Sequence, residues 1–236
     1  MHIERILHTQ GFGTRRECRA LVRLGRVTVA GAPCDDPFAE YEFDHLEFTV
    51  DGVPWQARQR AYLMLNKPGN YECSRRPIHN PSVFTLLPPP LLHRGVQPVG
   101  RLDADTSGLL LFSDDGDFIH GLSSPKREIA KIYEVGTRHP ADEALRMNLL
   151  AGVQLHDEPA PIAAADCRLT GERQLLLTIT EGKYHPVKRM IAAAGNRVDV
   201  LRRVAIGALE LPADLEPGQW RWLGPIELAA LGFPRS

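Results

Sequence analysis

The spacing of apolar residues near the N-terminus predicts a short helix. Ile3, Ile6 and Leu7 lie three and four positions apart, which places them on one face of a helix. The segment Gly11-Phe12-Gly13 then ends the helix, because its two glycines interrupt the helical pattern. The chain is therefore expected to begin with one amphipathic helix and a turn.

A second helix is predicted directly after this turn. Thr14 is suited to cap its N-terminus, with Glu17 at the capping-box position. Cys18, Leu21 and Val22 share one face of this helix. The basic residues face elsewhere: Arg15, Arg16, Arg19, Arg23 and Arg26. We expect an apolar inner face and a basic outer face.

The pattern then changes to strands. Apolar and polar residues alternate over residues 26–29 and again over residues 46–51, as in a half-buried strand. The polar residues 56–60 have the composition of a linker. We therefore predict a small N-terminal domain over residues 1–56, a linker over 57–60 and a larger domain over 61–236.

The larger domain is predicted to be α+β. Four apolar runs have the length and composition of buried strands, and one segment has helical spacing. The runs are residues 62–67, 109–112, 132–135 and 174–179, and the helix is residues 187–194. Because strands outnumber helices and do not alternate strictly with them, we expect a mixed, mainly antiparallel sheet with flanking helices.

Composition and the absence of several signatures narrow the class of protein. Hydrophobic residues are 43% and charged residues 24% of the 236, as in an average globular protein. No apolar run is long enough to span a bilayer and the N-terminus has no apolar signal segment, so we expect a cytoplasmic protein. The four cysteines form no CxxC pair and the histidines show no metal spacing. No phosphate-binding glycine loop or Gly-x-Ser-x-Gly motif is present, so we expect neither a metal nor a nucleotide cofactor.

Charge is segregated along a chain whose formal net charge is only -1. Residues 1–30 carry six arginines against two glutamates, and residues 181–203 carry six basic residues against two acidic ones. Residues 31–60, in contrast, carry seven acidic residues against two arginines. Two basic patches therefore remain as candidate nucleic-acid contacts.

The segment Gly100-Arg101-Leu102-Asp103-Ala104-Asp105-Thr106-Ser107-Gly108 is a candidate catalytic loop. It directly precedes the apolar run 109–112, so its polar side chains are expected at the edge of a sheet. The alternative is a structural turn, because Asp, Ser and Thr side chains often bond their own backbone.

Two further segments carry candidate chemistry. Residues 181–190 place Lys183, Lys188 and Arg189 at a loop-to-helix junction, where a cation keeps a nearby carboxylate ionised. The alternative is a solvated basic helix end. Tyr133 begins a strand and offers either a stacking surface for an unstacked base or an ordinary core ring.

Taken together, these motifs resemble one enzyme family, the RsuA-type pseudouridine synthases, which modify bacterial rRNA. The resemblance rests on LMLNKP, GRLDADTSGLLLFSDDGDF, KIYEV and EGKYHPVKRM, in this order. In addition, GTRRECRALVRLGRVTVAG resembles the αL-type RNA-binding module, first named for a small-subunit ribosomal protein. The resemblance covers nearly the whole chain and implies a cofactor-free pseudouridine synthase.

The resemblance also assigns roles to residues. It implies that Asp103 is the catalytic aspartate, that Tyr133 stacks on the target base and that Lys188 is the basic partner of Asp103. The remaining basic positions are expected to contact RNA: Arg101, Arg15, Arg16, Arg19, Arg26, Lys67, Lys183 and Arg189.

Two departures from the family pattern stand out. Pro186 occupies a position where the family usually has Gln, and proline removes a backbone donor next to Lys188. Glu4-Arg5 stands where the N-terminal module usually has Leu-Asp.

The expected substrate is a uridine of small-subunit (16S) rRNA, free or within an assembling particle, and the expected form is a monomer without membrane contact. Tyr184-His185 supports this target, since large-subunit relatives more often have Asn-Arg there. The alternatives are a large-subunit enzyme, a non-catalytic rRNA-binding assembly factor, and an acid/base hydrolase using Asp103 and Asp105. The hydrolase fits poorly, because two carboxylates two positions apart in one loop do not face each other across a cleft.

Overall fold

The chain forms two compact units in the computed structural model, which describes residues 1–180 and 186–233. The first unit consists of Met1–Tyr62, Leu87–Gln97 and Ser113–Asp115. The second unit consists of Leu63–Leu86, Pro98–Phe112 and the described chain from Gly116 onward. Each unit is described separately below.

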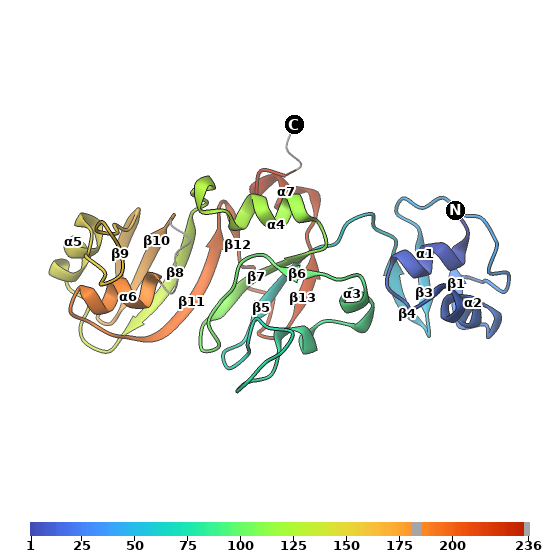
Figure 1. The fold of residues 1–236 in the computed structure, drawn as a ribbon, viewed down its shortest axis with the longest axis horizontal. Coiled ribbons are helices and arrows are strands. Elements are labelled where there is room, and N and C mark those ends of the chain that lie inside the picture. The colour runs from blue at the N-terminus through green and yellow to red at the C-terminus, as the bar shows by residue number, and fades with distance from the viewer. Residues whose placement is uncertain (181–185, 234–236) are drawn as a thin grey trace. The chain divides into compact units, whose positions relative to one another are not determined.

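The first unit packs helices against a small antiparallel sheet with strand order β2-β1-β3-β4 (Figure 1). Its elements are α1 (Ile3–Thr9), α2 (Arg15–Arg23), β1 (Val27–Val29), β2 (Ala32–Pro33), β3 (Glu47–Val50), β4 (Val53–Gln56) and α3 (Pro89–His93). The apolar faces of α1 and α2 meet the sheet in one core, in which Ile3, Cys18 and Val22 are fully buried.

The predicted capping box of α2 is confirmed. The Thr14 hydroxyl accepts a hydrogen bond from the Glu17 N–H at 3.3 Å, and the Glu17 carboxylate accepts one from the Thr14 N–H at 2.7 Å. Two backbone donors at the start of the helix are thereby satisfied. The unusual Glu4 also has a structural partner, because its buried carboxylate accepts from the Arg19 guanidinium and ties α1 to α2.

The second unit is built on a mixed sheet with strand order β13-β5-β7-β11-β8-β10-β9, as the α+β prediction required. Its strands are β5 (Tyr62–Lys67), β6 (Gln97–Pro98), β7 (Ser107–Ser113), β8 (Lys131–Thr137), β9 (Asp166–Gly171), β10 (Gln174–Ile179), β11 (Val198–Ile206), β12 (Leu209–Glu210) and β13 (Trp220–Trp222). Strand β11 runs parallel to β7 and antiparallel to β8. The pairs β13–β5, β8–β10 and β10–β9 are antiparallel as well.

Helices and 3-10 turns flank this sheet (Figure 1). They are the 3-10 turns η1 (Val83–Leu86) and η2 (Pro125–Arg127) and the helices α4 (Gly116–Ser123), α5 (Glu143–Ala151), α6 (Pro186–Ala193) and α7 (Pro225–Ala230). Helices α5 and α6 pack against each other, α5 against β9 and α6 against β11. No helix in the described part of the chain is long and apolar enough to cross a membrane.

The interior of the second unit consists largely of the predicted apolar strands. Leu109, Leu110, Leu111 and Phe112 are fully buried, in agreement with the continuous apolar run of β7. Strand β11 was not predicted, because the adjacent pair Arg202-Arg203 made this segment resemble a basic surface. Its central position in the sheet explains why one of these arginines is buried.

Candidate active site

A pocket of about 650 Å³ opens beside the loop that precedes β7. All of its lining residues belong to the second unit. Asp103, Tyr133 and Lys188, predicted from three separate segments, all line it. The loop before β7, the strands β8 and β11 and the helix α6 therefore contribute to one site.

Asp103 lies in a short turn that its own backbone stabilises. The Asp103 carbonyl accepts a hydrogen bond from the Thr106 N–H at 3.2 Å, and the Ala104 carbonyl accepts one from the Tyr71 N–H at 3.2 Å. Leu102 is buried beneath the turn, whereas the Asp103 carboxyl is only partly exposed. The carboxyl is thereby held at the wall of the pocket.

Lys67 supports this turn from inside the protein, which corrects its predicted role as an RNA contact. The residue is fully buried at the end of β5, and its Nζ donates to the carbonyls of Pro68 (3.0 Å), Ala104 (3.0 Å) and Thr106 (2.6 Å). Burial lowers the pKa of its ammonium to about 8. With all three donors used and no exposed surface, Lys67 holds the loop of Asp103 and does not reach a phosphate.

Lys188 bridges two carboxylates of the loop. Its Nζ lies 3.2 Å from Asp103 Oδ2 and 2.6 Å from Asp105 Oδ1. The predicted pairing with Asp103 is therefore present in the structure, and Asp105 is a second partner that was not predicted. Asp105 is exposed and lies outside the pocket lining, an arrangement unlike that of two carboxylates facing across a cleft.

The ion pairs shift the pKa values of their members. Burial lowers the pKa of Lys188, but its hydrogen bonds to Asp105 and Asp103 outweigh burial and raise it overall. Burial raises the pKa of Asp105, but the hydrogen bond from Lys188 and its charge lower it overall. Both groups are therefore charged over a wide pH range around neutrality.

Tyr133 presents an aromatic ring to the same pocket. It lies in β8, is 7% exposed and lines the pocket, between Leu177 in β10 and Arg203 in β11. A largely buried aromatic ring at the pocket wall is a candidate stacking surface for an unstacked base.

Two cations on this wall were not identified from the sequence. Arg203, opposite Tyr133 in β11, is 2% exposed, and Lys131, two positions before Tyr133, is partly buried. Both line the pocket. The sequence could have indicated Lys131, because it lies two positions before Tyr133 and residues two apart in a strand share one face. It gave no such indication for Arg203, because the strand of Arg203 was not predicted.

The predicted RNA-binding residues divide into several environments. Arg101 is exposed at the pocket, and Arg189 forms an ion pair with Asp157. Arg26 is paired with Asp51. Lys183 lies outside the described residues, as do Tyr184 and His185.

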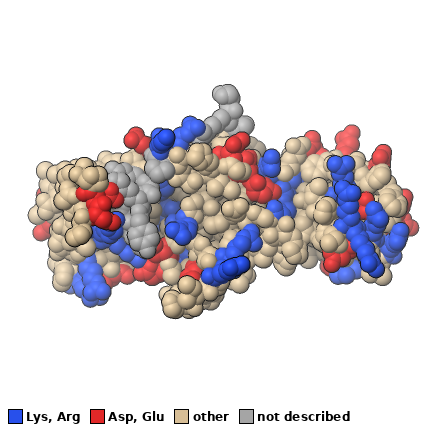
Figure 2. Space-filling model, viewed as in Figure 1, with Lys and Arg blue, Asp and Glu red and all other residues tan. Residues whose placement is uncertain are grey.

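Lys and Arg side chains gather over α1 and α2 of the first unit (Figure 2). Arg15, Arg16 and Arg23 in α2 are exposed, whereas Arg19 is partly buried in its contact with Glu4. The predicted basic outer face of α2 is thus present, with Arg19 serving at least in part to hold the two helices together.

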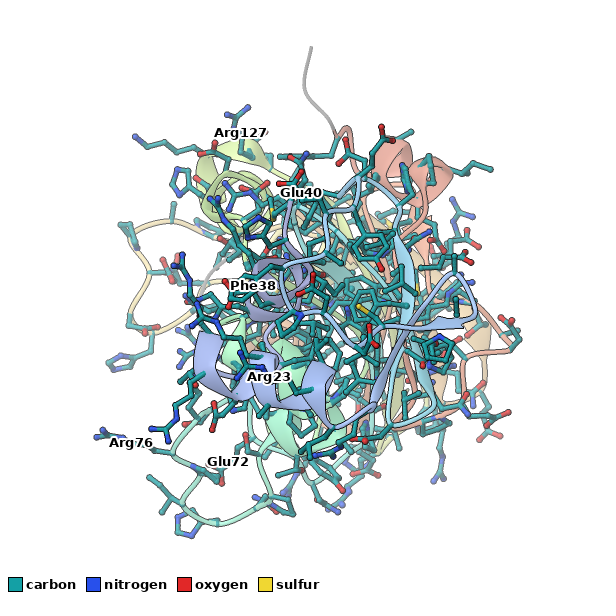
Figure 3. The ribbon with its side chains drawn as sticks, turned by 90° about the vertical axis from the view of Figure 1, so that its right-hand side faces the viewer. Arg23, Phe38, Glu40, Glu72, Arg76 and Arg127 are labelled. Atoms are coloured by element: carbon teal, nitrogen blue, oxygen red, sulfur yellow. The ribbon has the colours of Figure 1, made fainter. Side chains whose placement is uncertain are left out.

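A loop beside the pocket is held in one shape by a single carboxylate. Glu72 accepts hydrogen bonds from the backbone N–H groups of Ile78 (2.9 Å), His79 (2.8 Å) and Asn80 (2.8 Å), which lower its pKa to about 2. Within this loop, Arg76 points away from the ribbon (Figure 3). The loop thus presents a cation to solvent close to the pocket-lining residue Glu72.

The described residues contain no cluster of three or more His, Cys, Asp or Glu suited to a metal ion. The pocket lining includes the carboxylate of Asp103, several cations and the aromatic ring of Tyr133. Such a set suits a reaction on a nucleoside, with the ring for the base and the carboxylate for the sugar.

Two family models match the chain. The model of the S4 domain matches residues 3–37, and the model of RNA pseudouridylate synthase matches residues 61–193. The chain is 36% identical over 240 residues to a Bacillus subtilis protein named "Uncharacterized RNA pseudouridine synthase YtzG", covering 100% of both chains. It is 36% identical over 235 residues to the Yersinia pestis ribosomal small subunit pseudouridine synthase A, covering 99% of each.

A solved structure resembles the chain over the same extent. The crystal structure of a pseudouridylate synthase superposes with a TM-score of 0.69 at 31% sequence identity, covering 98% of this chain and 99% of the other. The similarity therefore includes the fold as well as the sequence.

Proposed function

The chain belongs to the RNA pseudouridylate synthase family, and from that premise we propose that it isomerises one uridine of small-subunit ribosomal RNA to pseudouridine, using Asp103 and no cofactor. The observation that carries this proposal is the meeting of Asp103, Tyr133 and Lys188 in one pocket. Substrate choice rests on the relatives that are named for the small ribosomal subunit.

The reaction assigns a task to each of these groups. The bond between N1 of uracil and C1′ of the ribose breaks, the base rotates, and C5 bonds to C1′; N1 gains a proton and C5 loses one. Asp103 supplies the carboxylate that attacks the nucleoside or takes a sugar proton. Lys188 orients it through their ion pair. Because product and substrate are isomers, the reaction balances without a redox partner or water.

Tyr133 supports the base while it is detached. Stacking on an aromatic ring contributes about 1–3 kcal/mol per base, and we assign its hydroxyl a part in removal of the C5 proton. The target uridine leaves its stack to enter the pocket, at a cost of a few kcal/mol that single-stranded RNA reduces. Phosphate contacts from the basic face of α2 and from Arg101 offset that cost.

We propose further that the enzyme acts as a monomer. An rRNA substrate fits a protein of the cytoplasm, acting on free rRNA or on an assembling small-subunit particle. The S4 domain match supports the first unit as the part that holds the rRNA.

The deciding experiment uses Asp103→Asn. The purified protein is incubated with 16S and, separately, 23S rRNA transcripts, and pseudouridine is detected by chemical labelling and mapped to a nucleotide. We expect product in 16S rRNA with the wild type, none with Asp103→Asn, and similar RNA affinity for both proteins.

Three other outcomes would contradict the proposal. Product in 23S rRNA alone would assign the enzyme to the large subunit. RNA binding without product would identify a non-catalytic assembly factor. Substantial turnover by Asp103→Asn would remove the aspartate from its assigned role.

A further inference from the structure

Arg203 is a buried cation with unused hydrogen-bonding capacity. Its side chain is 2% exposed, and its Nε donates to the Leu109 carbonyl at 2.8 Å. Its Nη2 is buried and bonds to no residue in the described part of the chain. A guanidinium carries five N–H donors, and leaving a buried donor unmatched is unfavourable. The side chain is therefore equipped to bind a further acceptor.

The position of Arg203 relates this capacity to the pocket. Its backbone pairs with that of Tyr133 in β8 and Gly108 in β7, and the residue lines the pocket together with Asp103. Among the described residues, no carboxylate forms an ion pair with Arg203. Asp103 forms its ion pair with Lys188 instead. Arg203 is thus a buried positive charge without a counterion among the described residues, within the same pocket as the reactive carboxylate.

Lys131 extends this cationic wall. It lies two positions before Tyr133 in β8, and its Nζ donates to the Ile129 carbonyl at 3.2 Å. Burial, and then the charge of Arg203, lower its pKa. Two cations near the ring of Tyr133 make this wall suited to a flat ligand with acceptor oxygens.

We infer that Arg203 donates a hydrogen bond to a ring carbonyl oxygen of the target uracil and stabilises the negative charge that the base acquires during the reaction. This inference rests on the proposed function. When the N1–C1′ bond breaks and its electron pair stays with the base, the charge spreads over N1, O2 and O4. A buried donor facing one of these oxygens binds the detached base more tightly than the bound uridine, which accelerates the reaction.

The burial of Arg203 favours the uracil base over a phosphate as its ligand. Arg203 is almost entirely buried, whereas Arg101 and Arg76 are exposed to solvent, which suits them better to contact with phosphates. Its pairing with Tyr133, the proposed stacking ring, places it beside the base and not beside the sugar-phosphate chain.

The test combines a protein change with a change in the substrate. Transcripts of 16S rRNA are prepared with uridine, 2-thiouridine or 4-thiouridine, because sulfur is a weaker acceptor than oxygen. Single-turnover rates are measured for the wild type, Arg203→Gln and Arg203→Lys. We expect Arg203→Gln to lower the rate with uridine by about 10²-fold, with RNA affinity nearly unchanged and Arg203→Lys intermediate.

The ratio of rates between uridine and thiouridine is the decisive readout. In the wild type, one of the two thio substitutions slows the reaction, and in Arg203→Gln that ratio moves toward one. A merely structural role, through the bond to Leu109, lowers all rates together and leaves the ratio unchanged. Because each ratio is taken within one protein, it remains valid even where a variant is less stable.

The outcomes separate this inference from the proposed function. Product from the wild type with an equal ratio in both proteins would overturn the role of Arg203 alone. Loss of RNA affinity in Arg203→Gln, again with an equal ratio, would identify a phosphate as its ligand and overturn the inference. No product from the wild type on any rRNA would contradict the proposed function and the inference with it.

Discussion

Gly108 and Arg203 approach each other so closely that their backbones leave no room for a side chain. A Cβ added to Gly108 would lie 2.2 Å from the Arg203 carbonyl oxygen, and the Gly108 φ of +101° is one that L residues rarely adopt. This close approach joins β7, which follows the loop of Asp103, to β11, the parallel strand that carries the buried arginine. Glycine at this position therefore sets the spacing of the two strands.

Gly108→Ala is expected to destabilise the second unit and reduce activity. The unfavourable φ alone costs about 1–3 kcal/mol, and the overlap forces β7 and β11 apart. Thermal or denaturant unfolding measures the change. Gly116→Ala is the matched control, because a Cβ there meets no atom within 4 Å and its φ is not positive; its stability should change by less than about 1 kcal/mol. Equal stability of the two variants would contradict the proposed spacing role.

Lys67→Met is expected to loosen the loop of Asp103. Methionine fills a similar volume but leaves the carbonyls of Pro68, Ala104 and Thr106 without their donor. We expect a loss of about 3 kcal/mol in the free energy of unfolding and a lower reaction rate, since Asp103 belongs to the same turn. Lys126→Met, at an exposed lysine, serves as the control and should change neither. If the free energy of unfolding and the reaction rate of Lys67→Met equal those of the wild type, Lys67 does not anchor the loop.

The same residue predicts a pH dependence. Because burial lowers the Lys67 pKa from 10.5 to about 8, the unfolded chain binds more protons than the folded chain between these two values. Stability arising from this group therefore increases as the pH rises from about 8 toward 10.5. The difference in unfolding free energy between the wild type and Lys67→Met, measured across this window, should show that increase. A difference that declines with rising pH would contradict it.

Lys188 and Asp105 are expected to differ in importance although they are bonded to each other. Lys188→Met removes the cation shared by both carboxylates, so we expect the rate to fall on the order of 10²-fold. Asp105→Asn leaves Lys188 in contact with Asp103 and should cost less than about 10-fold. The single-turnover rates of Lys188→Met and Asp105→Asn are measured on 16S rRNA and compared with that of the wild type. A larger loss in Asp105→Asn than in Lys188→Met would reverse their assigned roles.

The basic face of α2 is expected to contribute to RNA affinity by binding phosphates. Replacing Arg15, Arg16 and Arg23 together by Gln should weaken rRNA binding and leave the fold intact, because all three are exposed. The dependence of log affinity on log salt should become shallower by about 0.7–0.9 for each phosphate that the variant no longer neutralises. Binding titrations at several salt concentrations measure both effects.

A matched control shows whether position or charge alone matters. Arg138, Arg168 and Arg173 are also exposed but lie in the second unit, outside the pocket lining. Arg138 and Arg168 form surface ion pairs with Asp199 and Asp166. Their replacement by Gln removes the same charge and should alter the salt dependence less. Equal effects of the two triple variants would indicate that net charge, not the face of α2, determines affinity.

Local features of this protein were predictable from local sequence. The capping box of Thr14 and Glu17 spans one helical turn, so its residue types are sufficient to specify it. Strand β7 is buried on both faces, and its apolar run predicts that directly. Asp103 could be located because it is adjacent to that strand.

Buried charges were not predictable, because their partners are distant in sequence. The buried Lys67 donates hydrogen bonds to carbonyls such as that of Thr106, 39 residues away. Arg203 donates to the carbonyl of Leu109, 94 residues away. In isolation, both residue types indicate a solvent-exposed surface. Only the order of strands in the sheet reveals that they lie inside, and no local pattern specifies that order.

Strand β11 lies between β7 and β8 in the sheet, although it follows both in the chain. During synthesis, a ribosome therefore releases the loop of Asp103 and the ring of Tyr133 before the strand that joins them exists. Until residue 206 has emerged, the nascent polypeptide holds Asp103 and Tyr133 in two unconnected pieces of β-structure. An unfinished or C-terminally clipped chain that stops before this strand would carry its RNA-binding helices but no assembled enzyme.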